Sequence, residues 1–416
     1  MNPEVMERPL RHVVVESELD IVAAVLAAKD RGESVRPVGA AGSKNACYKT
    51  AGTSLSFERY NRVLSVDGEY VTVQAGTTVG TLNAALAAQG LALPTNGEWA
   101  GATVAGALSS GTHGGSAAHG IFASSVESMR IVTAGGQILE LRRGDPLFQH
   151  VAVSFGTFGV ISTVTCRCEA RFYLEMVMRV EPFERYVMQL ATAQRAHEFY
   201  AAVWFPSARR VVTFAADRAP RPVRAVRRRE RFCPATFLAN KMSTHLGVNV
   251  LRNRWFTATA VDSWDRILTP IAGGSKRVQM LRRLSDDWQA AEVAIPSERA
   301  AETLGRLDAF LADHRHTLVN PVGLRASAAD GFSLSPCYGR ASFWMDLFYR
   351  RNDAFESALE DVVGDLDARC HWGKHMALRP VYLRRQYPRW DAFGSARASL
   401  DPDGMFANQF TRRFGL

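Results

Sequence analysis

Lysine is scarce in this sequence: six lysines stand against 44 arginines among 416 residues, and the formal net charge is +9. The densest basic run covers residues 218–231, but Pro220 and Pro222 interrupt it and no aromatic residue is interleaved. A nucleic acid, a membrane surface or an anionic substrate can bind such a run, and a solvated surface loop is the simpler interpretation. The sequence contains no helix-turn-helix, zinc-finger or RNA-recognition pattern, so we expect no nucleic-acid partner.

Long apolar runs and metal-binding cysteine patterns are also missing. No run of about 18 or more apolar residues occurs, which argues against a membrane span. The first residues have no apolar signal core. The six cysteines form no C-x-x-C pair and no Cys/His cluster with zinc spacing. We therefore expect a cytoplasmic protein with buried, reduced thiols and without a metal site. The sequence leaves the oligomeric state open.

The two common nucleotide-binding signatures do not occur either: there is no P-loop, and no G-x-G-x-x-G motif lies inside a βαβ unit. Glycine is instead concentrated in three loops, GAAGS at 39–43, AGALSSGTHGG at 105–115 and SFGTFGVIS at 154–162. Glycine lets a ligand approach bare backbone N–H groups, and successive N–H groups form anion sites. A tight turn explains any one loop, but three loops on one elongated ligand indicate a dinucleotide. FAD fits best, because pyrophosphate needs N–H donors and isoalloxazine needs a flat slot.

The distribution of glycine and of apolar residues along the chain predicts two main parts. Residues 10–170 read as a dense α+β unit, with a helix capped by Ser17 and Asp20 and ended by Gly32. Hairpins are expected around Asp67-Gly68 and around the glycine pair at 135–136. From about residue 171 glycine thins out, and longer alternating strands occur with amphipathic helices such as the one within 297–314. The tail from 371 is again polar and rich in turns.

These motifs carry a resemblance to a known superfamily. VRPVGAAGS, TVAGALSSGTHGG and SFGTFGVIS resemble the FAD domain of the vanillyl-alcohol oxidase/p-cresol methylhydroxylase superfamily. LRASAADGFSLSPCYGR (324–340), HWGK (371–374) and the ending FANQF are similar to the sugar-1,4-lactone oxidases and alditol oxidases. The resemblance covers nearly the whole chain.

The resemblance implies an α+β, two-domain flavoprotein. The expected parts are an FAD-binding domain at 1–170, an antiparallel-sheet substrate domain flanked by helices at 171–370, and a C-terminal return to the FAD domain at 371–416. It also implies an FAD-dependent oxidoreductase that oxidises a CH–OH group of a sugar-like, modified-polyol or lactone substrate. A hydride would pass to flavin N5, and O2 or another acceptor would then take the electrons.

The resemblance also assigns site residues. The expected FAD contacts are Val38, Gly39, Ala40, Ala41, Gly42, Ser43, Ala105, Gly106, Ser109, Gly111, Thr112, His113, Gly115, Gly120, Ile121, Gly159, Val160, Ile161 and Lys374. The expected catalytic residues are Lys374, Arg325 and His371.

Each expected catalytic residue has a simpler alternative. Lys374 would place a cation beside flavin N1 and C2=O, where negative charge develops on reduction; an exposed lysine on a turn is the alternative. An interdomain ion pair is the alternative for Arg325, and a structural hydrogen bond for His371. His119, just after the second glycine loop, is as readily a loop histidine that bonds its own backbone.

The sequence departs from the family pattern at the first glycine loop. Many relatives read G-x-G-H-S, and that histidine is joined covalently to the flavin. Here Gly42 takes its place, and no histidine lies between His12 and His113. We therefore expect FAD to be bound without a covalent link.

Two further departures concern the substrate site. The usual E-x-R reads Gly323-Leu324-Arg325, and Phe348 stands near the place of a common histidine. We therefore expect a more apolar pocket, with Phe343, Trp344, Phe348 and Tyr349 as candidate walls, and a substrate larger or more apolar than a free alditol or lactone. Two alternatives remain open: a flavoenzyme acting at a C–N or C–C bond, and a non-enzymatic basic binding protein.

Overall fold

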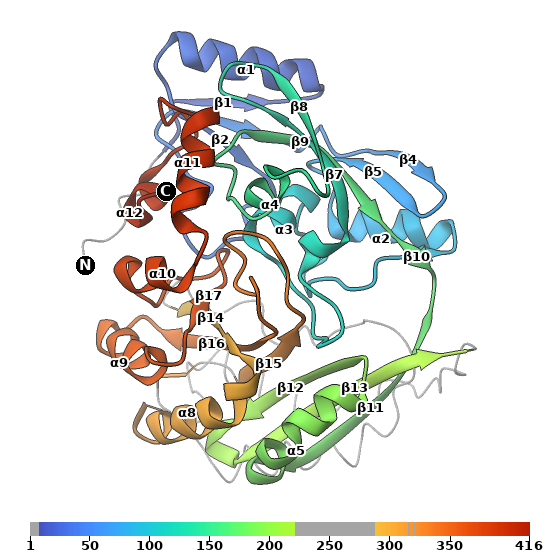
Figure 1. Cartoon of the computed structure of the whole chain (residues 1–416), viewed down its shortest axis with the longest axis vertical. Helices are drawn as coiled ribbons and strands as arrows, with labels where there is room; N and C mark the ends of the chain where they lie inside the picture. The colour runs from blue at the N-terminus through green and yellow to red at the C-terminus, as the bar shows by residue number, and fades with distance from the viewer. Residues whose placement is uncertain (1–7, 221–287, 315–316, 319–320) are drawn as a thin grey trace, which may run out of the picture.

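The N-terminal part contains two small sheets. The computed structural model describes residues 8–220, 288–314, 317–318 and 321–416, and Figure 1 shows these sheets above a longer sheet. The three-stranded sheet has the order β1-β3-β2 and pairs in parallel, and the five-stranded sheet has the antiparallel order β4-β5-β9-β7-β8. The strands are β1 (Arg11–Val14), β2 (Val35–Val38), β3 (Thr53–Ser56), β4 (Val63–Asp67), β5 (Tyr70–Gln74), β7 (Val126–Val132), β8 (Ile138–Arg142) and β9 (Val160–Arg167). β6 (Leu91–Ala92) and β10 (Glu169–Ala170) form a separate antiparallel pair.

The local signals in this part are confirmed. Helix α1 (Glu18–Asp30) begins at a capping box, in which Ser17 and Asp20 bond each other's backbone N–H groups. The hairpin β4–β5 turns at Gly68, which has a φ of 57°. The hairpin β7–β8 encloses the expected glycine pair. Helices α2 (Val79–Ala88), α3 (Val104–Ser110) and α4 (Phe148–Val151) and the 3-10 turn η1 (Phe122–Ser125) complete this part.

The second part is built on one seven-stranded sheet. Its order is β11-β13-β12-β15-β16-β14-β17, and every neighbouring pair is antiparallel. The strands are β11 (Tyr173–Pro182), β12 (Phe199–Phe205), β13 (Arg210–Ala219), β14 (Trp288–Pro296), β15 (Val322–Ser327), β16 (Ser342–Arg350) and β17 (Arg369–Cys370). Helices α5 (Phe183–Ala196), α8 (Ala300–His314) and α9 (Asp353–Val363) lie along its outer side (Figure 1). The 3-10 turns η2 (Pro206–Ala208) and η4 (Ser297–Arg299) precede β13 and α8.

The C-terminal segment returns to the N-terminal part. Figure 1 shows α10 (Pro380–Gln386), α11 (Trp390–Leu400) and α12 (Gln409–Phe414) on the side that carries the N-terminal strands. The buried Arg36 guanidinium donates to the carbonyls of Phe406, Cys47 and Phe155, which joins three distant segments. The side-chain amide of Asn408 donates to the carbonyl of Ala46, 3.1 Å away. The antiparallel sheet with outer helices and this return agree with the α+β, two-domain fold that the sequence predicts.

The structure also tests what the composition predicts about membrane spans, cysteines and the basic run. No helix among the described residues is long and apolar enough to cross a bilayer. Cys47, Cys166, Cys168, Cys337 and Cys370 are buried free thiols, as expected. Cys233 and residues 221–231 of the basic run lie outside the described residues.

Candidate active site

The three glycine loops and the HWGK segment lie together. Phe155, in the third loop, donates its N–H to the carbonyl of Ser109 in the second loop at 3.2 Å. Lys44, just after the first loop, donates its N–H to the carbonyl of Gly373 at 2.8 Å. Asn45 donates its side-chain amide to the carbonyls of Trp372 and Lys374, both at 2.7 Å. The fold therefore brings together four segments that are up to 330 residues apart in sequence.

The first loop offers bare backbone donors. Gly39, Ala40, Ala41 and Gly42 are exposed, and Ala41 has a φ of 48°. Among the described residues, the N–H groups of 39–43 donate to no other backbone group. Successive free N–H groups around a residue with positive φ form an anion-binding concavity. This loop fits the pyrophosphate of a dinucleotide.

Close packing explains why this loop needs glycine. A Cβ at Gly39 would lie 2.2 Å from Thr103 Oγ1, and a Cβ at Gly42 would lie 1.8 Å from the Trp99 ring. No side chain fits at 42 without moving that ring. Two buried side-chain oxygens, Asn96 Oδ1 and Ser154 Oγ in the third loop, have no hydrogen-bond partner in the described part of the chain. Unpaired buried oxygens are groups that a polar cofactor would complete.

The other expected cofactor residues fall into two groups. An accessible group lies along the loops: Val38, Ser43, Ala105, Gly106, Ser109, Thr112, Gly115 and Gly120 are exposed or half-buried. A buried group, Gly111, His113, Ile121, Gly159, Val160 and Ile161, packs inside the protein. His119 does not bond its own backbone: its Nε2 lies 2.8 Å from Glu198 Oε1 and its ring stacks on Phe199.

A buried cluster of charges lies at the meeting point of the second loop and the long sheet. Glu292 (β14) is at its centre, with Oε1 3.0 Å from His113 Nε2 and 3.5 Å from an Arg325 nitrogen. Lys374 Nζ lies 3.4 Å from Glu292 Oε2 and 3.0 Å from each carboxylate oxygen of Asp346 (β16). Five separate segments thus supply the imidazole of His113, two cations and two carboxylates.

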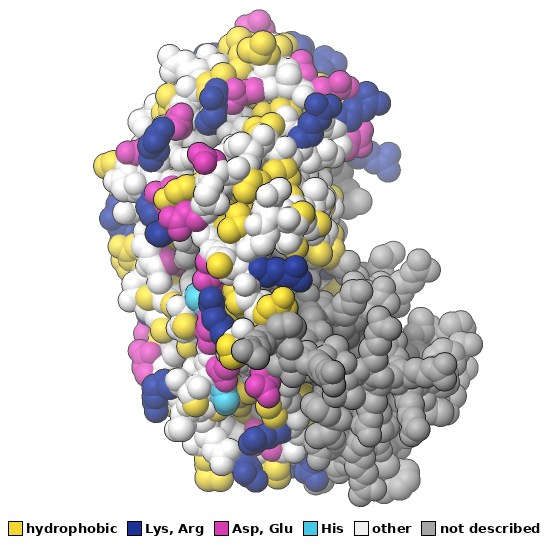
Figure 2. Space-filling view, turned by 90° about the vertical axis from the view of Figure 1, so that its right-hand side faces the viewer, with side chains coloured by type: hydrophobic (Ala, Val, Ile, Leu, Met, Phe, Trp, Pro, Cys, Tyr) yellow, Lys and Arg dark blue, Asp and Glu magenta, His cyan; other side chains and the backbone are white. Residues whose placement is uncertain are grey.

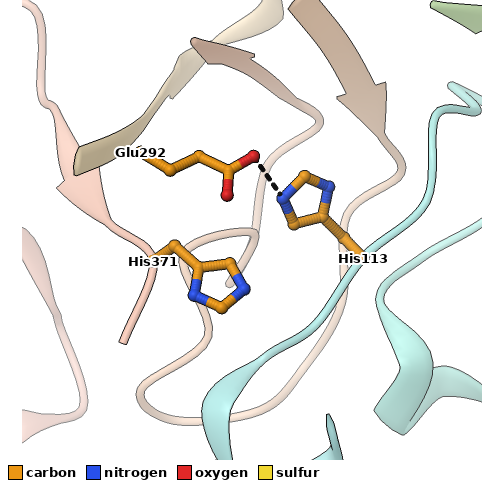
Figure 3. A group of neighbouring side chains, drawn as sticks. All are labelled: His113, Glu292 and His371. Carbon is orange, nitrogen blue, oxygen red and sulfur yellow. Dashed lines mark hydrogen bonds and ion pairs between the residues drawn. The ribbon is translucent and has the colours of Figure 1, made fainter. Parts of the chain in front are cut away.

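Both ring nitrogens of His113 lie at hydrogen-bond distance from an oxygen atom. Its Nδ1 lies 2.9 Å from the carbonyl oxygen of Gly114, which can only accept. Its Nε2 faces the carboxylate of Glu292, as Figure 3 shows. Both ring nitrogens of His113 are therefore held by oxygen atoms of other groups. Its ring also stacks on the indole of Trp344, with the ring centroids 3.8 Å apart.

The charges shift one another in opposite directions. Burial acts to raise the pKa of Glu292, but the charges of Lys374 and His113 outweigh it and hold that pKa well below its usual range. Burial raises the pKa of Asp346 to about 6, although Lys374 lowers it in part. The pKa of Lys374 is raised despite its burial, because Asp346 and Glu292 stabilise the ammonium. While Asp346 is ionised, Lys374 and Arg325 balance the charges of the two buried carboxylates.

His371 differs from the other members because it is neutral. Burial lowers its pKa to about 3, with the charge of Glu292 opposing the shift. Its Nδ1 accepts the N–H of Gly373 at 2.9 Å, so the structural hydrogen bond named as the alternative is present. Figure 3 shows His371 and His113 on either side of the Glu292 carboxylate, and donor atoms of the three lie within 4.8 Å of one another. Lys374 and Arg325 already compensate Glu292 and would repel a metal ion, so we interpret this group as part of the charge cluster.

The two other expected catalytic residues, Lys374 and Arg325, are both held by carboxylates. The side chain of Lys374 is 22% exposed and is held by two carboxylates, so the turn-lysine alternative is wrong. Arg325 does form the ion pair between parts of the chain that we named as its alternative, with Glu98 Oε1 at 2.8 Å. The Glu98 side chain is 71% exposed, whereas Arg325 is largely buried. A flexible surface carboxylate therefore occupies one face of a buried guanidinium.

The expected apolar walls are partly wrong. Residues of β16 alternate between faces, and Tyr349 packs with Phe355 of α9 on the helix side, so Tyr349 and Phe343 point away from the cluster. Trp344 lies at the cluster, against His113. The ring centroid of Phe348 is 5.3 Å from Lys374 Nζ, which confirms that Phe348 is near.

The site contains two acidic residues, Asp346 and Glu292, although the glycine at 323 led us to expect a site without its usual acid. Asp346 lies directly opposite Gly323 in the β15–β16 ladder, and Glu292 comes from the strand beyond. The sequence analysis missed both residues. Each is a lone acid inside an otherwise apolar strand, in QAAEVAIP and FWMDLFY, and that isolation is the signal that would have found them.

The described residues that bear on a basic binding face are Arg218 and the coloured surface of Figure 2. Arg218, the first residue of the basic run, is paired with Glu169 and Glu198. On the face shown in Figure 2, basic and acidic side chains are interspersed over the upper part of the molecule.

Comparisons with known proteins agree with the geometry. Residues 9–142 match a family described as FAD binding domain, and residues 164–414 match D-arabinono-1,4-lactone oxidase. An L-gulono-1,4-lactone dehydrogenase of Mycobacterium tuberculosis is 29% identical over 95% of this chain and 94% of its own length. An L-gulonolactone oxidase of Bos taurus is 30% identical over 95% of this chain and 93% of its own length. A solved solvent-stable cholesterol oxidase superposes with a TM-score of 0.81 at 19% identity, over 97% of this chain and 94% of its own.

Proposed function

We propose, from the premise that the chain belongs to the D-arabinono-1,4-lactone oxidase family, that it oxidises a CH–OH group of a free sugar-1,4-lactone. The protein is an FAD-dependent oxidoreductase of the vanillyl-alcohol oxidase/p-cresol methylhydroxylase type. Neither a C–N or C–C oxidase nor a basic binding protein is favoured by its relatives.

One observation carries the proposal: a buried cluster that contains Lys374 and Arg325 adjoins a loop of unpaired backbone amides. When bound, FAD supplies the acceptor for a hydride and gains negative charge at its N1 and C2=O side. Fixed cations in a buried site stabilise such charge without reorganisation. Lys374 and Arg325 are the cations available, and Glu292 and Asp346 hold them in place.

The chain's residues have separable tasks in this proposal. The N–H groups of 39–43 bind the pyrophosphate, and Asn96 and Ser154 complete the contacts of the cofactor with their unpaired oxygens. Arg325 and Lys374 orient oxygen atoms of the substrate. The stacked Trp344 and Phe348 exclude water from one side of the cluster.

The polar cluster also changes the expected substrate. Each buried hydroxyl without a partner costs about 1–3 kcal/mol, so a site for a lactone with several hydroxyls must supply partners. Arg325, Lys374, Asp346 and Glu292 supply both donors and acceptors. A free sugar lactone, the substrate class in the names of the relatives, is therefore compatible with this site.

We propose further that FAD is held without a covalent bond. Gly42 has no side chain to form one, and the Trp99 ring occupies the space where such a side chain would lie. Acid denaturation of the purified yellow protein should release all flavin into the supernatant. Flavin fluorescence that stays with the polypeptide on a denaturing gel would contradict this proposal.

The function is tested by anaerobic mixing of the holoenzyme with a panel of L- and D-configured sugar-1,4-lactones, alditols and aldoses. We expect the flavin bands to bleach with at least one lactone and much more slowly with alditols. A panel in which no lactone bleaches the flavin, although dithionite does, would overturn the proposal. Oxygen consumption then distinguishes an oxidase from a dehydrogenase, since relatives of both kinds exist.

Two expectations from the sequence remain proposals. The division at 1–170, 171–370 and 371–416 is supported by the bonds that Arg36 and Asn408 make between the first and last parts. A cytoplasmic location is supported by the five buried free thiols.

A further inference from the structure

A side chain at position 323 would occupy the same part of the site as the side chain of Asp346. They are paired across the β15–β16 ladder. A Cβ built on Gly323 would lie 3.3 Å from Asp346 Cβ and 3.6 Å from an Arg325 nitrogen. Cross-strand Cβ atoms normally stay about 4.5–5.5 Å apart, so an acidic side chain at 323 and the present Asp346 cannot both be accommodated without a shift. The glycine therefore leaves room for an acid that comes from the opposite strand.

We propose that Asp346 takes the place of the acid missing at 323 and accepts the hydroxyl proton of the substrate. This inference rests on the proposed function. In the step, the C–H bond of the carbinol breaks, its hydrogen and electron pair pass to FAD, and the O–H proton passes to the Asp346 carboxylate. The carbon becomes a carbonyl, FAD is reduced by two electrons, and Asp346 becomes a carboxylic acid.

The geometry favours Asp346 over the other two candidate bases. Glu292 contacts His113, Lys374 and Arg325, which stabilise its carboxylate and make it a poor proton acceptor. His371 already uses Nδ1 to accept the N–H of Gly373. Among the described residues, the Asp346 carboxylate forms an ion pair with Lys374 alone, through both oxygens.

Electrostatics support the same choice. A general base works best when its pKa is near the working pH. Three charged groups face Asp346: Lys374 from the HWGK segment, Glu292 from β14 and Arg325 from β15. With burial, they bring its pKa to about 6, whereas that of Glu292 is held well below its usual range and that of His371 falls to about 3. Lys374 also fixes the direction of the Asp346 carboxylate.

The test compares the reduction rate of the bound flavin in the parent holoenzyme and in Asp346→Asn, which keeps the size of the side chain. We expect a loss of about 10²-fold or more, the usual contribution of a general base, and loss of the inflection near pH 6. A second pair of variants moves the acid back across the ladder. Gly323→Glu combined with Asp346→Gly should reduce its flavin about tenfold or more faster than Asp346→Gly alone, because the glycine at 346 makes room for the glutamate.

A matched control removes a buried carboxylate outside the site. Glu360 of α9 is ion-paired with Arg379, and Glu360→Gln should keep the parent rate and pH profile. A rate for Asp346→Asn within about threefold of the parent, with the inflection unchanged, would overturn the proposal. If Asp346→Asn does not fold, Asp346→Gly alone is compared with Asp346→Gly combined with Gly323→Glu. Equal rates of flavin reduction in these two variants would overturn the proposal.

A second readout needs neither substrate nor cofactor. Because the pKa of Asp346 is higher in the folded chain than the ordinary value of 3.8, its contribution to stability is present below pH 3.8 and is lost as pH rises through 6. The melting temperature of the parent apoprotein should therefore fall over this range relative to that of Asp346→Asn. If no lactone is oxidised by the parent but this difference is present, the proposed function fails and the titration of Asp346 stands. If the difference is missing, the assignment of the base fails by itself.

Discussion

The glycine loops and the buried charge cluster are built in opposite ways. The loop at 39–43 uses backbone N–H groups of adjacent residues, and its proposed function follows from a stretch of five residues. The cluster uses side chains from five segments that are far apart in the sequence. The loop needs the absence of side chains, whereas the cluster needs each charge to have its partners. The two regions should therefore respond differently to substitution: the loop to added volume, and the cluster to lost charge.

The largest effect is expected at the centre of the cluster. Glu292→Gln keeps the shape but leaves His113, Lys374 and Arg325 with only Asp346 and the exposed Glu98 to balance them. Removing one partner of a buried ion pair costs about 3–5 kcal/mol of unfolding free energy. Urea unfolding of the apoprotein measures this loss of unfolding free energy.

The matching control is again Glu360→Gln. Its partner Arg379 has a side chain that is 74% exposed, so water can replace the lost carboxylate and the cost should be about 1 kcal/mol or less. Equal costs for the two variants would show that the cluster is no more than an ordinary surface network.

The next effect separates chemistry from cofactor binding. Lys374→Met keeps the apolar stem and removes the charge, so FAD should still bind through the glycine loops. The reduction rate per bound flavin should fall on the order of 10²-fold or more, the usual loss for one charge-stabilising donor. Stopped-flow absorbance measures the rate. Lys29→Met, on the exposed last turn of α1, should react like the parent. Reduction of Lys374→Met at the parent rate would remove this lysine from the mechanism.

A smaller effect is expected in the first loop. Gly42→Ala places a Cβ where the Trp99 ring lies, at 1.8 Å, and overpacking of this kind costs about 1–3 kcal/mol. If the loop shifts to relieve it, FAD should bind about tenfold more weakly, while the reduction rate of bound flavin stays near that of the parent. Fluorescence titration of apoprotein with FAD measures this. Gly394→Ala in α11, where nothing lies within 4 Å of the new Cβ, should bind FAD like the parent.

The smallest effect is a change in pH dependence. The pKa of His371 falls to about 3 in the folded chain, below the ordinary value of 6.5. A lowered pKa contributes stability that is present above pH 6.5 and is lost as pH falls towards 3. His371→Asn keeps an acceptor for the Gly373 N–H and does not titrate. Its melting temperature should decline less than that of the parent between pH 6.5 and 4. The exposed His12→Asn should decline as the parent does.

Much of the fold could be predicted because its signals are local. The capping box of α1, the hairpin at Gly68 and the glycine loops each depend on a few neighbouring residues, whose backbone preferences act without the rest of the chain. Lys374 and Arg325 were found only through the resemblance of their motifs. The faces of β16 were assigned wrongly for Phe343 and Tyr349, because an almost continuously apolar strand does not reveal which side carries helices.

The sequence by itself determined the positions of the turns, the bare backbone of residues 39–43 and the lack of a tethering histidine at 42. Only the tertiary structure decided that Glu292, Asp346 and His113 meet Lys374 and Arg325. The physical reason is that a buried charge is tolerated only beside its partners. Which partners a residue acquires depends on the order and register of strands that are distant in sequence. The pairing of Gly323 with Asp346 is the clearest instance, because neither residue alone shows that the site keeps its acid.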